Sequence, residues 1–381
     1  MRKLRADWIF ANHDLLPQAV LELDADGTVL DVRAATPLDG DAEYFQGLIC
    51  PGFVNAHCHL ELSYLKGHIP MGTGMAGFIL RLQSLRSHFP EEARIAAAIA
   101  ATDSMATRGI VAVGDICNGP SALAAKAAHP EIVFHNFVEV FGMQPDRAEE
   151  IVLNALALVQ QLGPRSSLTL HAPYSISVAL RNRVLDYAAT RGWLQSIHVL
   201  ESAEERQLFA ELDGPLMDFL RGLGMGFQAH TYASPIDFVL EHFPPKVPGL
   251  LVHNTQMLPG EIADIAGRFP DLNFVLCPLA NRYIHGTLPA MEAFADFADR
   301  VCLGTDSLAG NQQLDIFAEM QCLQTEKGLP TELLLRWATV NGARALGLDA
   351  SRFQIVKGHC PTLLHLTGFG PEQSHLPAVT T

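Results

Sequence analysis

Two histidines separated by one residue, His57 and His59, follow an apolar run and could bind one metal ion. Residues i and i+2 of a strand point to the same side, so both imidazoles can reach one ion while Cys58 points away. Taken alone, the pair is also compatible with two solvated histidines. We expect Cys58 to face the surrounding helices and to be inert.

Five more polar residues stand at or just after the ends of later apolar runs. They are His171, His198, Glu201, His253 and Asp306. Each alone has an ordinary explanation: a hydrogen-bonded histidine or, for the Thr-Asp-Ser stretch around Asp306, a helix N-cap. Their joint occurrence after apolar runs favours one common site. Imidazole and carboxylate groups are suitable ligands for Zn²⁺ or another borderline divalent ion.

Such a site needs a scaffold that brings distant strand ends together. From residue 48 to about 352, short apolar runs alternate with stretches of helical period, which is typical of a parallel sheet. The eight candidate strands are 48–56, 109–116, 132–140, 168–171, 194–200, 249–253, 273–276 and 301–304. Helices are expected over 91–107, 148–162, 178–191, 204–220, 261–269 and 291–298.

This alternation predicts an α/β fold, a (β/α)8 TIM-like barrel with its reactive groups at the C-terminal ends of the strands. A doubly wound open sheet is the alternative, although no Gly-rich phosphate-binding motif follows any candidate strand. Residues 1–47 show β-strand patterns, with a hairpin predicted at Asp26-Gly27. The apolar run 361–366 could return to these strands. We therefore expect a small composite β-sandwich domain from 1–47 plus 353–381, beside a barrel over 48–352.

The composition excludes several classes of protein. Of 381 residues, 49% are hydrophobic and 18% are charged, so the chain can bury a large core. A net charge of −15 argues against binding to nucleic acid or to an anionic membrane surface. No apolar run is long enough to span a bilayer. The seven scattered cysteines indicate reduced thiols in a cytoplasmic protein, and a homodimer is compatible with these features.

Four segments resemble the amidohydrolase superfamily, in particular its aminohydrolase branch of cytosine, guanine and adenosine-type deaminases and triazine chlorohydrolases. These segments are 51–60 (PGFVNAHCHL), 198–201 (HVLE), 251–254 (LVHN) and 303–308 (LGTDSL). The sequences of segments 303–308 and 337–342 (WATVNG) look most like those of deaminases in the aminofutalosine branch of menaquinone synthesis. The resemblance covers residues 45 to 348 and implies a barrel hydrolase. In the tail, the stretch 356–362 (VKGHCPT) departs from the family's usual Gly-Lys-x-Ala-Asp pattern.

The resemblance also implies roles for single residues. His57, His59, His198 and Asp306 resemble the metal ligands, and Glu201 resembles the acid that transfers protons. His253 resembles the histidine that hydrogen-bonds the metal-bound water, while His171 and Asn281 resemble residues near the substrate. Binuclear branches bridge two metals with a carboxylated lysine. Because no predicted strand end carries a lysine, we expect one divalent ion, Zn²⁺ first, with Fe or Mn as alternatives.

Together these roles imply a metal-dependent hydrolytic deaminase of an aminated heterocycle. A bound ion lowers the pKa of its water from near 16 to roughly 7. Asp306 can take the water's proton, Glu201 can protonate a ring nitrogen, and His253 can stabilise the tetrahedral oxygen. The small-molecule substrate that we expect is a 6-aminopurine nucleoside or analogue: adenosine, S-adenosylhomocysteine or aminodeoxyfutalosine. A chlorohydrolase or cyclic amidohydrolase is the alternative, and a non-catalytic ligand-binding barrel is the weakest interpretation.

Two further features bear on the substrate. The segment 67–74 (GHIPMGTG) is a candidate mobile cover of the site, although an ordinary long loop is equally compatible with it. Arg81 or Arg282 could meet an anionic group of the substrate, or either could be a solvated charge.

Overall fold

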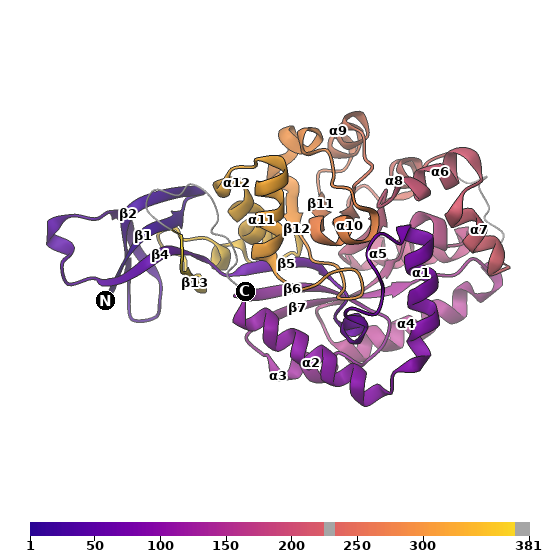
Figure 1. Ribbon diagram of the computed structural model, residues 1–381, viewed down its shortest axis with the longest axis horizontal. Helices are drawn as coiled ribbons and strands as arrows, with labels where there is room; N and C mark the ends of the chain where they lie inside the picture. The colour runs from indigo at the N-terminus through magenta and orange to yellow at the C-terminus, as the bar shows by residue number, and fades with distance from the viewer. Residues whose placement is uncertain (225–232, 370–381) are drawn as a thin grey trace.

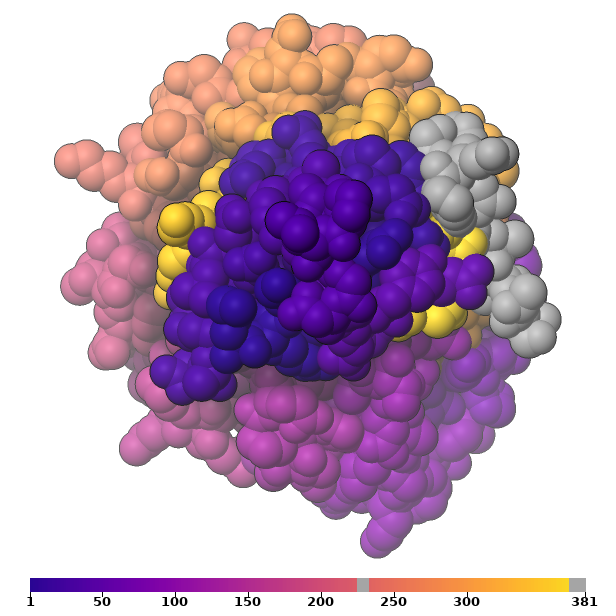
Figure 2. Space-filling model, turned by 90° about the vertical axis from the view of Figure 1, so that its left-hand side faces the viewer, coloured from indigo at the N-terminus to yellow at the C-terminus, as the bar shows by residue number. Residues whose placement is uncertain are grey.

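A sheet built from both ends of the chain projects from one side of a larger α/β part (Figure 1). The computed structural model describes residues 1–224 and 233–369. The sheet has the order β13-β4-β1-β2-β3. Its strands are β1 (Arg2–Ala11), β2 (Asp14–Leu23), β3 (Val29–Ala34), β4 (Glu43–Pro51) and β13 (Leu363–Leu366). Figure 2 views the molecule from this side, with the indigo N-terminal strands nearest the viewer.

Two predictions for the small sheet are confirmed. β2 and β3 pair in antiparallel fashion around the predicted hairpin, where Gly27 has a φ of 85° that suits glycine. β13, from the tail, pairs in antiparallel fashion with β4. Within the described residues these strands form a single five-stranded sheet. The two-sheet sandwich expected from the sequence is therefore not confirmed.

The apolar run 48–56 is two strands rather than the one that we predicted. β4 ends at Pro51 in the small sheet, and β5 (Phe53–Cys58) begins the α/β part. The hydrogen-bond partner changes at this point: the Gly52 amide donates to Thr362, and the Phe53 amide donates to Gly109. A Cβ on Gly52 would lie 2.7 Å from the Val111 methyl groups, so glycine permits this close passage.

The α/β part contains two four-stranded parallel sheets, which confirms the predicted α/β class. One sheet holds β5, β6 (Ile110–Cys117), β7 (Val133–Val140) and β8 (Ser166–Leu170). The other holds β9 (Gln195–Val199), β10 (Gly249–His253), β11 (Leu272–Leu276) and β12 (Val301–Leu303). Hydrogen bonds join the sheets at both edges, from the His198 amide to the His171 carbonyl (2.9 Å) and from the Thr305 amide to the His57 carbonyl (2.9 Å).

Three helices have the predicted bounds: α2 (Glu91–Thr107), α4 (Ala148–Leu162) and α5 (Val178–Arg191). The single helix predicted over 204–220 is wrong. It is split into α6 (Ala203–Glu211) and α7 (Pro215–Gly222) because Leu212 and Gly214 adopt positive φ (54° and 95°) and Pro215 starts a new helix. Residues 291–298 lie in a 3-10 helix, η6 (Met291–Arg300), rather than an α-helix.

The remaining elements connect the strands and cover the sheets. The other α-helices are α1 (Gly74–Leu85), α3 (Leu123–Ala128), α8 (Pro235–His242), α9 (Pro259–Arg268), α10 (Pro278–His285), α11 (Ile316–Lys327), α12 (Thr331–Arg336) and α13 (Gly342–Ala345). Short turns of 3-10 helix are η1 (Pro37–Asp39), η2 (Leu60–Leu65), η3 (Arg86–His88), η4 (Pro145–Arg147), η5 (Pro173–Ser175) and η8 (Ala350–Phe353), and η7 (Trp337–Asn341) is a π-helix.

Side-chain burial agrees with the expected cysteine chemistry. Six of the seven cysteines are buried, Cys360 is exposed, and none of the seven forms a disulfide. Cys58 is buried in the hydrophobic cluster that contains Ala98 and Met105 of α2, and burial raises the pKa of its thiol well above the usual range. The prediction of an inert Cys58 on the helix side is therefore supported. Among the helices of the described residues, none is long and apolar enough to cross a membrane.

Candidate metal centre and active site

Three imidazoles converge where β5 and β9 end. β5 leads from the small sheet into the α/β part, so its end lies away from the small sheet (Figure 1). The Nε2 atom of His57 lies 3.2 Å from those of His59 and His198, and the latter two are 3.4 Å apart. Nitrogens bound at about 2.1 Å to one tetrahedral ion lie about 3.4 Å from each other. Oδ1 of Asp306 lies 3.3 Å from His59 Nε2 and 3.7 Å from His57 Nε2. These four side chains fit a single divalent ion.

The ionisation of these groups suits a metal centre. Burial lowers the pKa of His57 and of His59 well below the usual range, so both imidazoles are neutral and have a lone pair to give. The Nδ1 atom of His198 donates to the His171 carbonyl at 2.9 Å, which leaves its Nε2 lone pair facing the centre. Burial raises the pKa of Asp306 to about 6, and the neighbouring His198 partly offsets this effect.

The backbone is strained at two histidine or aspartate positions of the site. His253 and Asp306 have positive φ, 72° and 56°, and so do their neighbours in the site, Leu200 and Asn254. Such conformations cost free energy for non-glycine residues and are found preferentially at functional sites. The Asn55 side chain holds Thr305, beside Asp306, through hydrogen bonds of 2.7 and 3.1 Å. The strained turn after β12 is thereby fixed to β5.

The carboxylate of Glu201 lies between two histidines. Its Oε2 is 3.5 Å from His253 Nε2, and its Oε1 is 3.5 Å from His285 Nε2. Burial alone would raise the pKa of Glu201, but His253 and His285 together hold that pKa below its usual range. Glu201 is thus an ionised, buried carboxylate beside the metal centre, and it can accept a proton.

Two residues of α10 contact His253 and Glu201. Asn281 was predicted to contact the substrate, but it is fully buried, does not line the site cavity and instead lies with its Nδ2 3.1 Å from His253 Nδ1. This contact places the proton of His253 on Nε2, which faces Glu201. His285 was not predicted from the sequence. Its position four residues after Asn281, on the same face of one helix, was an available signal.

A cavity of about 210 Å³ opens onto the centre. The predicted residues that line it are His59, His171, His198, Glu201, His253 and Asp306. The polar residues in its wall that were not predicted from the sequence include Arg86, Asn118 and Glu139. One of them, Glu139, stands next to the end of the candidate strand 132–140, so the same strand-end rule could have found it. His171 faces the cavity with its Nδ1 fixed by Ser175 Oγ at 2.7 Å.

The segment 67–74 does not itself line this cavity. The helix that follows it, α1, does so with Met75, Phe78, Ile79 and Leu82. The carboxylate of Glu204 accepts hydrogen bonds of 3.0 and 2.9 Å from the Met75 and Ala76 amides, which fixes the first turn of α1. The element that covers the site is therefore a helix.

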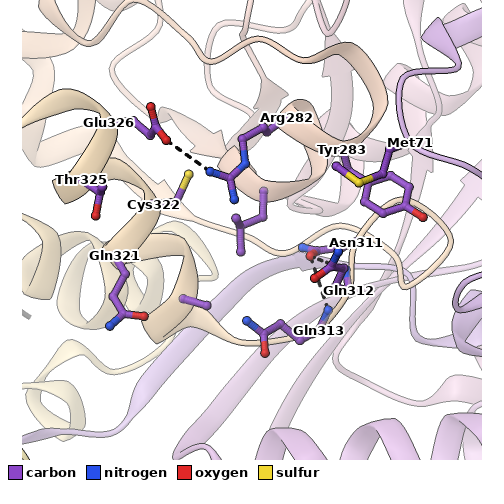
Figure 3. Close-up of a pocket in the computed structure, with 12 residues that line it drawn as sticks. Met71, Arg282, Tyr283, Asn311, Gln312, Gln313, Gln321, Cys322, Thr325 and Glu326 are labelled. Atoms are coloured by element: carbon purple, nitrogen blue, oxygen red, sulfur yellow. Dashed lines mark hydrogen bonds and ion pairs between the residues drawn. The ribbon is translucent and has the colours of Figure 1, made fainter. Parts of the chain in front are cut away.

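Neither arginine considered in the sequence analysis reaches the site. Arg81 is exposed on α1 and does not line the cavity. Arg282 lines a separate hollow between α10 and α11, where Figure 3 shows it pointing toward Glu326, 3.4 Å away. No residue in the lining of that hollow also lines the site cavity. Recognition of an anionic substrate group by Arg81 or Arg282 is thus not supported.

Gly304 sets the position of the first ligand. A Cβ at this residue would lie 2.8 Å from the Cβ of His57 and 3.0 Å from its backbone N and O. We expect Gly304→Ala to displace His57, to destabilise the fold by about 1–3 kcal/mol and to reduce the metal content. Thermal unfolding and elemental analysis measure both effects. Gly267→Ala in α9, with nothing within 4 Å of the added Cβ, is the neutral control; an unchanged Gly304→Ala protein would contradict the close approach.

The geometry agrees with the comparison to known proteins. The profile of the amidohydrolase family matches residues 48–355, most of the chain. The chain belongs to the amidohydrolase family. As a member it is a metal-dependent hydrolase that acts on carbon–nitrogen bonds, and the three-histidine centre contains its candidate metal-binding residues.

Individual relatives agree with this membership. Aminodeoxyfutalosine deaminase of Deinococcus radiodurans is 29% identical over 319 residues, which cover 79% of this chain and 73% of that protein. The structure of Helicobacter pylori aminofutalosine deaminase in complex with methylthio-coformycin has a TM-score of 0.80 at 21% identity and covers 95% of this chain and 91% of that chain. The zinc complex of atrazine chlorohydrolase from Arthrobacter aurescens has a TM-score of 0.72 at 17% identity, with 94% and 85% covered.

Proposed function

We propose that this amidohydrolase removes the 6-amino group of an adenine nucleoside by hydrolysis. One observation carries the proposal: the ionised Glu201, held by two histidines, and the cluster of His57, His59, His198 and Asp306 meet at one cavity. Deamination needs both a water-activating centre and a carboxylate that moves protons to the leaving group. The relatives named deaminases of aminodeoxyfutalosine and of adenosine support the substrate class.

His57, His59, His198 and Asp306 would hold one divalent ion, with Zn²⁺ the best match to this donor set. When bound, such an ion supplies Lewis acidity that makes a water molecule nucleophilic near neutral pH. A second group of potential donors, Glu139, His171 and His198, also lies close together. His198 cannot serve a second ion, because its Nδ1 proton is already donated to the His171 carbonyl.

Elemental analysis of the purified protein is therefore expected to find about one equivalent of Zn, Fe or Mn per chain, and chelation is expected to remove activity with it. Two tightly held equivalents per chain would contradict the single centre, and so would full activity of metal-free protein.

The side chains then have separate tasks. Asp306, which touches the centre and lines the cavity, accepts the proton of the attacking water. Glu201, which starts ionised, receives that proton and delivers it to N1 of the purine. It then moves the second proton of the attacking water, now on the C6 hydroxyl, to the departing ammonia, which is general acid–base catalysis. His253 is neutral because burial lowers its pKa well below the usual range, and its Nε2–H can donate to the oxygen that forms at C6.

His171 lines the cavity beside Glu139, at the end of the neighbouring strands, and would contact the sugar. The buried Glu139 Oε1 has no hydrogen-bond partner within the described residues and lies 3.6 Å from His198 Nδ1. A buried carboxylate oxygen without a donor is costly, and a sugar hydroxyl would satisfy it. This environment favours a nucleoside over a free base.

We also infer that the two parallel sheets close into one eight-stranded barrel. The hydrolase domain predicted over residues 48–352 then begins with β5 at Phe53, because residues 48–51 belong to the small sheet. The hydrogen bonds at both edges of the sheets support closure. So do the contact of Cys58 with Asp306, which joins the first strand to the turn after the last, and the extent of the family profile over residues 48–355.

The test is a panel of substrates followed by ultraviolet absorbance. Adenosine, S-adenosylhomocysteine and aminodeoxyfutalosine should lose the adenine band on incubation with enzyme, at least one of them rapidly. Turnover of guanine, cytosine or a chlorotriazine without turnover of any adenine nucleoside would show that the substrate class is wrong while the hydrolytic centre is right.

A further inference from the structure

The apolar wall of the site cavity runs along α1 and ends in an arginine. Met75, Phe78, Ile79 and Leu82 line the cavity, and their spacing of three and four residues places them on one face of the helix. Arg86 follows Leu82 by four residues, caps the C-terminus of α1 and lines the same cavity. The guanidinium thus stands at the end of an apolar stripe.

A second helix extends the apolar wall. Phe219, Leu220 and Leu223, from α7 and its C-cap, line the cavity, and Leu220 shares a hydrophobic cluster with Met75 of α1. A ligand that fills this space would therefore contact hydrocarbon from both helices. Its far end could reach the positive charge of Arg86.

Arg86 acts on one carboxylate, that of Glu61, through its charge alone. Within residues 1–224 and 233–369, its guanidinium makes no ion pair and donates no hydrogen bond, although three carboxylates, Glu139, Glu201 and Asp306, line the same cavity. Apart from histidines, Arg86 is the one basic residue among the described residues of the lining. Arginine is suited to bidentate binding of a carboxylate, so an unpaired guanidinium facing a cavity favours an anionic ligand.

Neutralisation of Glu61 is the competing explanation for Arg86. The two residues line an adjoining hollow together. However, the Glu61 carboxylate accepts hydrogen bonds from the Asn118 and Gly119 amides, at 2.9 and 3.0 Å, and forms no ion pair with Arg86. Burial raises the pKa of Glu61 to about 7, and the charge of Arg86 and the two amides offset this only in part. Because the guanidinium forms no ion pair or hydrogen bond with Glu61, it stays available to a ligand.

We propose that Arg86 binds a carboxylate on the 5′ substituent of the nucleoside, while the walls from α1 and α7 contact the carbon part of that substituent. The inference rests on the proposed function, which fixes the purine C6 at the metal centre. It selects nucleosides with a long, partly apolar and acidic 5′ group. Aminodeoxyfutalosine, which ends in an aromatic carboxylate, fits this description, and adenosine and 5′-deoxyadenosine do not.

The test compares two substrates that differ only in charge, aminodeoxyfutalosine and its carboxamide, on wild-type enzyme and on Arg86→Gln. Wild type should prefer the acid. Arg86→Gln should lower kcat/KM for the acid about 10- to 100-fold, the size expected for a charge-assisted hydrogen-bond pair, and leave kcat/KM for the carboxamide unchanged. Arg86→Lys keeps the positive charge but cannot form two parallel hydrogen bonds to a carboxylate, so its kcat/KM for the acid should be intermediate. Arg81→Gln, on the exposed side of α1, should match wild type on both substrates.

Metal content and melting temperature establish that each variant is folded and loaded. An equal loss on acid and carboxamide would overturn the proposal, because a structural role of Arg86 affects both substrates alike. Unchanged kinetics of Arg86→Gln on the acid would overturn it as well. If wild type deaminates neither compound nor any other adenine nucleoside, the proposed function itself fails, and the inference fails with it.

Discussion

Glu201→Gln is expected to lower kcat about 10²–10⁴-fold while metal content stays at the wild-type level. The amide keeps the size and shape of the carboxylate that lies 3.5 Å from His253 and from His285, but it cannot accept and return a proton. Steady-state ammonia release and elemental analysis of the same preparation measure the two quantities.

Glu211→Gln is a matched control, since Glu211 ends α6 on the exposed surface, where it accepts a hydrogen bond from Gln207. We expect this variant to keep both rate and metal. If Glu201→Gln instead loses metal as completely as a variant of the histidine cluster, Glu201 is a ligand rather than a proton carrier.

His198→Ala is expected to empty or loosen the metal centre and to reduce activity to background. Its Nε2 lies 3.2 and 3.4 Å from those of His57 and His59, so its removal takes away one of the three converging nitrogens. Metal retained per chain after dialysis against a weak chelator measures the effect, with activity assayed in parallel.

His171→Ala is the comparison for this variant. His198 is oriented by the backbone carbonyl of His171, which survives substitution of the side chain. His171→Ala should therefore keep its metal and raise KM for the nucleoside. Full metal content in His198→Ala would show that His198 is not a ligand.

The strand-borne part of the site was predictable because two simple rules apply to it. Side chains of the same parity share one side of a strand, and the C-terminal ends of parallel strands meet. His57, His59, His198, His253 and Asp306 follow these rules, and the structure brings them together. Glu139 obeys the same rule and was therefore also predictable, since it stands one residue before the end of β7.

The residues that helices contribute to the site could not be predicted from these strand rules. His285, Asn281 and Arg86 reach the site from α10 and from the end of α1. Their positions depend on how each helix packs against the sheets, and the local sequence does not specify that packing. The family resemblance predicted Asn281 as a substrate-binding residue, whereas the packing of α10 places it outside the cavity lining, against Nδ1 of His253.

Two of the predicted strand and helix boundaries were wrong. The run 48–56 (LICPGFVNA) contains the pair Pro51-Gly52, which is typical of a break, and the hydrogen-bond partner changes there between the two sheets. No periodicity could reveal that change, because both halves are buried strand. The break between α6 and α7 was predictable, since Gly214-Pro215 interrupts the helical pattern and proline favours the first turn of a new helix.

Ammonia released per adenine nucleoside consumed, by enzyme before and after removal of its metal, tests the central claim most directly. We predict one ammonia per nucleoside with the metal present, none after chelation, and recovery when one equivalent of Zn²⁺ is returned. Loss of the adenine band without ammonia would contradict hydrolytic deamination, and undiminished ammonia release from metal-free protein would contradict the assignment of the three-histidine centre.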